Sequence, residues 1–158
     1  MRFTRLLAIG LALVMTASGC ASGPSLKDAA AELQKDTQRL EADDVFKNPL
    51  MKLRILQRPD KDIPCDKGRF KRVLRATAND ERNARDVDGH LDQAEGIMAG
   101  TLVNELGYKL ERPFSEGDAE EGRFIHALKE DVGIMVAVYV APEAPTWRLH
   151  AETPCLPR

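Results

Sequence analysis

The first 20 residues constrain this chain most, because they decide the compartment in which the remainder folds. Arg2 and Arg5 form a short positive region, and an uncharged, mostly apolar run of ten residues follows from Leu6 to Met15. Such a run is too short to cross a hydrocarbon core of roughly 30 Å, which needs about 20 helical residues. A short apolar run behind arginines is typical of a secretory signal peptide, so the segment predicts export.

Small residues, Ala17, Ser18 and Gly19, lead directly into Cys20. This ending resembles the lipobox of bacterial lipoproteins. The resemblance implies that a diacylglyceryl group is attached to the Cys20 thiol and that lipoprotein signal peptidase then cleaves before this residue. The expected organisation is a signal peptide at 1–19, a lipid-anchored tether at 20–25 and a single α+β domain at 26–158.

Other outcomes at this segment stay open. Ala17 stands where the family most often has leucine, and Ala17 with Gly19 would also suit ordinary signal peptidase, which would leave a secreted soluble protein. An uncleaved anchor is the third possibility. The lipoprotein interpretation places the domain on the extracytoplasmic face of the cell membrane.

Length and charge limit what the exported part can be. Without residues 1–19 the chain has 139 residues, and loss of Arg2 and Arg5 leaves 21 Lys and Arg against 25 Asp and Glu, a net charge of −4. This length favours one domain rather than two. An exported, mildly acidic chain is not expected to bind nucleic acid.

The lipobox resemblance also bears on the remaining cysteines. With Cys20 acylated, Cys65 and Cys155 are left as an even pair in an oxidising compartment, which predicts one disulfide. A redox-active or metal-binding pair is the alternative, although the sequence has no C-x-x-C spacing.

Hydrophobic periodicity predicts two helices and a set of strands. The helices are expected at 26–41, after a Ser25 cap, and at 88–106, between an Asp88 cap and Gly107. Strands are expected at 51–57, 69–78, 108–112, 122–129, 132–140 and 147–155. A disulfide between Cys65 and Cys155 would place the 69–78 strand antiparallel beside the last one. The predicted fold is an α+β two-layer sandwich, a mainly antiparallel sheet with two helices on one face.

Two features of the helices carry further expectations. The charged residues of the 26–41 helix, which include Glu32 and Asp36, are expected to form a solvated face, with partner docking as the alternative. Gly96 and Gly100 form a G-x-x-x-G pattern on the second helix, and we expect it to allow close packing onto the sheet.

No constellation for catalysis stands out in the sequence. Ser22, Ser25 and Ser115 lie outside any G-x-S-x-G or S-x-x-K motif, so no catalytic residue is predicted. The three histidines do not have zinc-ligand spacing, and no cofactor or metal ligand is predicted; they are His90, His126 and His150. The acidic loop 116–121 lacks the order of a calcium-binding loop and is expected to be solvated.

A binding role is therefore expected rather than an enzymatic one. The 69–75 strand is basic, through Arg69, Lys71, Arg72 and Arg75, and it offers a weak candidate for contact with anionic headgroups or cell-wall polymers. The chain looks like the small lipoproteins of high-GC Gram-positive bacteria, a resemblance that implies no particular activity. We expect a non-catalytic binding or accessory module of the cell envelope. An envelope hydrolase or metal-dependent enzyme, and a secreted soluble binding protein, are the alternatives.

Overall fold

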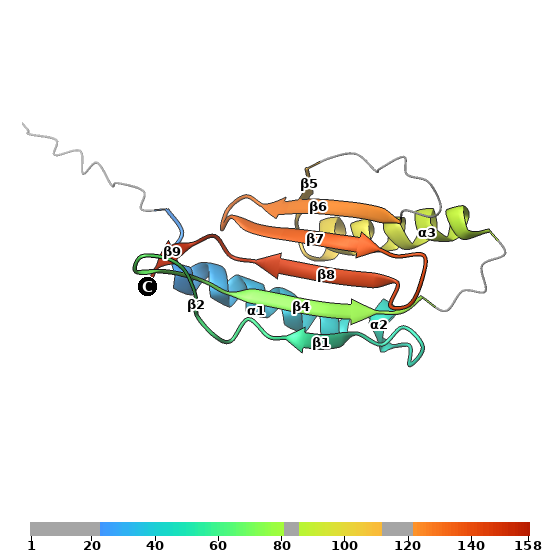
Figure 1. Ribbon diagram of the computed structural model, residues 1–158, viewed down its shortest axis with the longest axis horizontal. Coiled ribbons are helices and arrows are strands. Elements are labelled where there is room, and N and C mark those ends of the chain that lie inside the picture. The colour runs from blue at the N-terminus through green and yellow to red at the C-terminus, as the bar shows by residue number, and fades with distance from the viewer. Residues whose placement is uncertain (1–22, 81–85, 112–121) are drawn as a thin grey trace, which may run out of the picture.

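Two layers make up the molecule, a six-stranded antiparallel sheet and a layer of helices. The computed structural model describes residues 23–80, 86–111 and 122–158. Both long helices, α1 (Leu26–Ala42) and α3 (Val87–Gly100), lie behind the sheet in Figure 1. The sheet has the order β1-β4-β8-β7-β6-β5, with every neighbouring pair antiparallel. Its strands are β1 (Arg54–Gln57), β4 (Val73–Ala78), β5 (Lys109–Leu110), β6 (Arg123–Lys129), β7 (Ile134–Val140) and β8 (Trp147–Glu152). The predicted α+β two-layer fold is confirmed.

A second, three-stranded sheet carries the disulfide. It has the order β2-β3-β9, and its strands are β2 (Ile63–Asp66), β3 (Arg69–Lys71) and β9 (Leu156–Pro157). Cys65 in β2 is bonded to Cys155, just before β9, with their Cα atoms 6.1 Å apart. The predicted disulfide is thus present, and β4 lies antiparallel beside β8 as expected from it.

The strand expected at 69–78 is wrong at one residue, because Arg72 separates β3 from β4. The Arg72 backbone N–H donates to Thr153 Oγ1 at 2.9 Å. Its guanidinium lies against Asp62, with Nε 2.6 Å from Oδ1, and donates to the Pro59 carbonyl at 3.2 Å. These contacts direct the chain from the small sheet into the six-stranded sheet. The alternation of side chains along 69–78 does not reveal this break, so the sequence predicted one strand where two exist.

The core forms between the buried face of the sheet and apolar stripes on the helices. Ser25 caps α1 by accepting from the Asp28 N–H, and Leu33 and Leu40 of this helix are fully buried. Val138 of β7 and Trp147 of β8 meet them from the sheet side. A four-residue helix, α2 (Asp44–Lys47), follows α1 and adds Phe46, whose ring meets Trp147 edge-on at 5.9 Å.

The second helix starts differently from the prediction, whereas Gly107 follows its end with φ +74°, as expected. Asp86, not Asp88, caps α3, because its side chain accepts from the Gly89 N–H. The last turn is a π-helix, η1 (Thr101–Glu105), in which the Leu106 N–H donates to the Thr101 carbonyl. Short π-helical turns of this kind occur frequently at functional sites.

The connections at β5, β6 and β7 also differ from expectation. β5 has two residues where a strand over 108–112 was expected. The turn between β6 and β7 is longer than Glu130-Asp131, since the Gly133 N–H closes it by donating to the Lys129 carbonyl at 2.8 Å. Gly133 has φ +68°, a left-handed conformation that excludes Val132 from the strand.

Gly96 and Gly100 do not pack onto the sheet, so the expected role of the G-x-x-x-G pattern is wrong. A Cβ added at Gly96 would have no atom within 4 Å, and one at Gly100 would meet only the Asn104 side chain at 3.8 Å. Both glycines lie on the side of α3 that faces away from the sheet. Leu91 and Met98 lie on the opposite side of the helix and pack into the core against the sheet.

Alanine at position 96 is therefore expected to stabilise the protein by about 0.5–1 kcal/mol, because the residue is exposed in a helix interior with free space around it. Urea unfolding followed by tryptophan fluorescence would measure the change. Gly133→Ala is the matched control and should destabilise, since φ is +68° and Pro154 Cγ lies 3.2 Å from the added Cβ. A less stable Gly96→Ala variant would show that α3 is placed wrongly.

Candidate functional site

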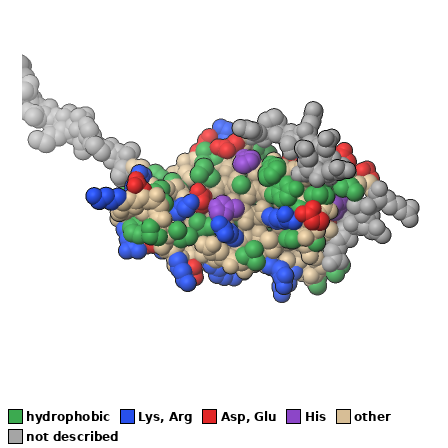
Figure 2. Space-filling view, in the orientation of Figure 1, with side chains coloured by type: hydrophobic (Ala, Val, Ile, Leu, Met, Phe, Trp, Pro, Cys, Tyr) green, Lys and Arg blue, Asp and Glu red, His purple; other side chains and the backbone are tan. Residues whose placement is uncertain are grey.

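The sheet face opposite the helices, called the open face below, is the most extensive candidate surface. Among the described residues no helix covers it (Figure 1). In Figure 2, which looks onto this face, hydrophobic side chains gather over β6 and β7, and Lys and Arg side chains lie mainly in the lower half. Phe124 is 56% exposed and Met135 48%, an unusual degree for large apolar side chains in the middle of a sheet.

One row of residues crosses five strands on the open face. The register pairs Arg54 with Thr77, Thr77 with Arg148, Arg148 with Tyr139 and Tyr139 with Phe124. We call these five residues the arginine–aromatic row. The Phe124 and Tyr139 rings lie 4.7 Å apart, and the Arg148 guanidinium sits 5.5 Å from the Tyr139 ring centroid, so the row is continuous from its aromatic end to its central arginine.

The next row, called the histidine row, contains a hollow at its centre. It pairs Arg75 with His150, His150 with Ala137 and Ala137 with His126. Because alanine is short, a hollow of about 220 Å³ opens over it between the two imidazoles, and two carboxylates also line this hollow, those of Glu111 and Glu152. His126 and His150 face outward on β6 and β8, which β7 separates, and the sequence analysis did not foresee their common row.

Charge is distributed unevenly over the open face. Arg148 Nη2 pairs with Glu143 at 2.6 Å, and Lys71 Nζ pairs with Glu152 at 2.8 Å. Within the described ranges, the side chains of Arg54 and Arg75 form neither an ion pair nor a hydrogen bond. An acidic chain thus presents unneutralised arginines on the half of the face formed by β1, β4 and β8.

The basic set predicted on residues 69–75 is not one patch. Arg72 is held by Asp62 and Lys71 by Glu152, while Arg69 belongs to the small sheet with β3. Arg75 alone of this set joins the open face, beside two arginines that the sequence analysis did not select, Arg54 and Arg148. Only the strand register could have identified that grouping, because the three residues lie on separate strands.

A groove on the helical side is the second candidate surface. It has a volume of about 750 Å³ and lies between the end of α1, α2 and the π-helix, with Ala42, Val45 and Gly100 among its lining residues. Several of its polar groups are already engaged with each other. Arg39 Nη1 donates to the Glu105 carbonyl at 3.4 Å, and Thr101 Oγ1 donates to Asp43 Oδ2 at 3.4 Å. We therefore rank this groove below the open face.

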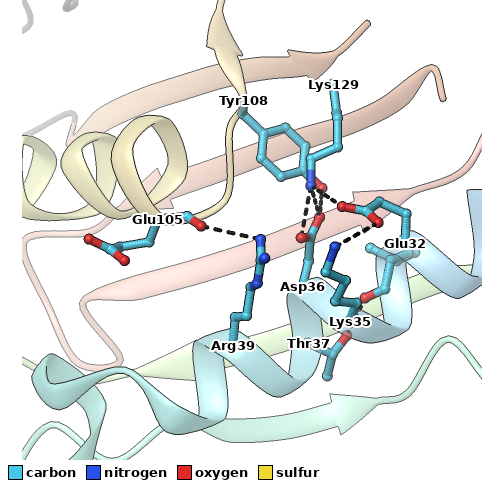
Figure 3. Close-up of polar contacts among 9 residues, drawn as sticks. Glu32, Lys35, Asp36, Thr37, Arg39, Glu105, Tyr108 and Lys129 are labelled. Atoms are coloured by element: carbon cyan, nitrogen blue, oxygen red, sulfur yellow. Dashed lines mark hydrogen bonds and ion pairs between the residues drawn. The ribbon is translucent and has the colours of Figure 1, made fainter. Parts of the chain in front are cut away.

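A buried ionic cluster joins α1 to the end of β6 (Figure 3). Lys129 Nζ donates to both oxygens of Asp36, at 2.8 and 2.7 Å, and to Glu32 Oε1 at 3.0 Å. The Tyr108 hydroxyl also donates to Asp36 at 2.8 Å, and its ring lies 4.8 Å from the Lys129 ammonium. Asp36 is 1% exposed, so its expected place on a solvated helix face is wrong.

The directions in which pKa values shift in this cluster agree with a structural role. The hydrogen bond from Lys129 lowers the pKa of Glu32. Burial, with Asp36 beside the hydroxyl, raises the pKa of Tyr108 far above its usual value, so the phenol stays protonated. The cluster has its donors and acceptors matched to each other and offers no reactive group to a substrate.

Several predicted residues lie outside the described part of the chain. These are the lipidation site Cys20, the serines Ser22 and Ser115, and the acidic loop 116–121. His90 lies on α3, with Nδ1 3.9 Å from Asp80 Oδ2, far in sequence and in layer from the other histidines. Within residues 23–80, 86–111 and 122–158 there is no group of three or more His, Cys, Asp or Glu side chains that could hold a metal ion. No helix of these same ranges is long and apolar enough to span a membrane.

Comparisons of the chain with protein-family models, with curated proteins and with solved structures found no match. Functional assignment therefore rests on the surfaces described above.

Proposed function

We propose that this protein is a non-catalytic binding module of the cell envelope, anchored by a lipid on Cys20, that holds its ligand on the open face. One observation carries the proposal: among the described residues no helix covers this sheet face, which bears aromatic side chains and, within the same ranges, unpaired arginines in register. Burying Phe124 and Met135 and neutralising Arg54 would all favour association with a ligand.

The anchor is supported by the sequence of the first 20 residues and by the short tether that follows it. A tether over 20–25 would keep the domain close to the membrane surface and to the polymers around it. The intact mass of the N-terminal peptide should therefore show an acylated Cys20. An unmodified Cys20 peptide would contradict the anchor and leave the secreted form of the same binding module.

Site-specific crosslinking in native membranes tests the binding face. A benzophenone amino acid replaces Thr77, which lies between Arg54 and Arg148 in the arginine–aromatic row. In the matched control it replaces Val103, which is 40% exposed on the π-helix. We expect a discrete adduct from position 77 and none from position 103, and loss of the adduct in Cys20→Ala. Adducts from position 103 alone would move the function to the helical groove.

A further inference from the structure

From the two rows of the open face we infer that its ligand is an acidic polysaccharide, a glycan bearing carboxylate or phosphate groups. This inference rests on the proposed function, because it names the ligand class of the same face.

Three arginines are neighbours of Thr77 on the open face by strand register. Arg54 and Arg148 flank Thr77 in one row, and Arg75 lies two residues before Thr77 on the same strand. The backbones of β1 and β8, the strands on either side of β4, are about 9–10 Å apart, a distance that long arginine side chains span easily. Planar guanidinium groups match the oxygens of carboxylate and phosphate, and the Thr77 hydroxyl offers a further donor on the strand between them.

Local charge favours an anion at this position. Arg54 and Arg75 have no acidic partner among the described residues, although the exported chain carries more acids than bases. Arginines left unneutralised on neighbouring strands repel each other, so an anion bound between them would relieve that repulsion. The first expected anchor of the ligand is therefore an acidic group at the arginine end of the row.

Aromatic side chains continue the same row away from the arginines. Phe124 and Tyr139 form a tilted pair, with His126 stacked on Phe124 at a ring-centroid distance of 6.5 Å. Sugar rings pack their C–H faces on such platforms while their hydroxyls stay hydrated, which suits an amphipathic ligand on an exposed surface. One ligand lying across the strands would meet arginines at one end and rings at the other.

The shallow shape of the open face and its few exposed apolar side chains argue against an acidic protein partner. Its hollow measures only about 220 Å³, and the large apolar side chains exposed on its strands are divided between Phe124 and Met135 on β6 and β7 and Leu56 on the edge strand β1. A protein interface needs a larger, desolvated apolar centre. A flexible, hydrated chain lying along the row requires no such centre.

Titration calorimetry on the intact chain in detergent tests the ligand class with four probes of known chemistry. Alginate hexasaccharide carries sugar rings and carboxylates, maltohexaose carries rings without charge, and polyglutamate and oligo(dT) carry charge without a carbohydrate polymer. We expect alginate to bind at low salt more tightly than each of the other three. Equal binding of polyglutamate or oligo(dT) would overturn the inference in favour of a general polyanion surface, and failure of alginate to bind would also overturn it.

Variants locate the binding on the two rows. Arg54→Gln with Arg75→Gln should weaken alginate binding by about tenfold or more, since each removes a charge-assisted contact. Lys61→Gln with Lys67→Gln removes the same charge from the exposed β2–β3 region and should have little effect. Phe124→Ala should weaken binding without changing its salt dependence. If the arginine and the lysine double variants lost alginate affinity equally, the binding site would not lie on these two rows.

Failure of this inference is distinguishable from failure of the proposed function. Addition of a neutral envelope glycan fraction to the ¹⁵N-labelled chain could shift amide signals of the open face while alginate does not. That result would keep the binding module and reject the acidic ligand. An envelope extract that shifts no signal of the open face would reject both.

Discussion

Lys129→Met is expected to lower the free energy of unfolding by about 3–5 kcal/mol, the usual cost of removing one partner from a buried ion pair. Methionine keeps most of the volume and apolar stem of the lysine side chain but lacks the ammonium that lies 4.8 Å from the Tyr108 ring centroid. The Asp36 carboxylate would remain buried with the Tyr108 hydroxyl but without its ammonium partner. The loss should also free α1 from the end of β6, which this cluster joins.

Urea unfolding followed by the fluorescence of the buried Trp147 would measure the change. Lys109→Met is the matched control, because Lys109 pairs with Glu130 at 3.0 Å while the two side chains are 73% and 61% exposed. That variant should lie within about 1 kcal/mol of wild type. A Lys129→Met protein as stable as the Lys109→Met protein would contradict the buried cluster.

Replacement of both Cys65 and Cys155 by serine is expected to destabilise the protein by about 2–5 kcal/mol. The bond closes a loop across a sequence separation of 90, which restricts the unfolded chain strongly. It also fixes the three-stranded sheet, in which β9 has two residues and pairs only with β3. Without the covalent bond to β2, this short strand should separate first.

Denaturation of wild type with and without reductant provides an independent comparison for the double serine variant. Both reduced wild type and the variant should unfold at similarly lower denaturant concentrations. A thiol assay on the native protein should find neither Cys65 nor Cys155 reactive. Two reactive thiols in folded protein, or no stability difference on reduction, would show that the bond does not form.

Local sequence patterns predicted those elements whose determinants lie close together in the chain. Ser25 with the apolar periodicity that includes Leu33 and Leu40 located α1, and the alternating valines of β7 located a strand. The cysteine pair gave the antiparallel neighbours β4 and β8. The break at Arg72 was missed because its cause, Thr153, lies 81 positions away.

The candidate site was less predictable because it depends on register across the sheet. Asp36 looked like one more charge on a helix surface, since its partner Lys129 is 93 positions away. Arg54 and Arg148 likewise carry no local signal, and they flank Thr77 only after β1, β4 and β8 have paired. In the sequence, Phe124 and Tyr139 resemble ordinary strand alternation, and only the fold shows that no described helix covers the face on which they lie.

The central claim is that the open face binds a ligand, and amide chemical-shift mapping of the intact, ¹⁵N-labelled chain in detergent tests it most directly. On addition of alginate hexasaccharide, we expect the changes to concentrate at Arg54, Arg75, Thr77, Arg148 and Tyr139. The Arg54→Gln/Arg75→Gln variant should lose them at the same ligand concentration. Changes concentrated instead around Val45 and Thr101, or none anywhere with alginate and with envelope extract, would contradict the claim.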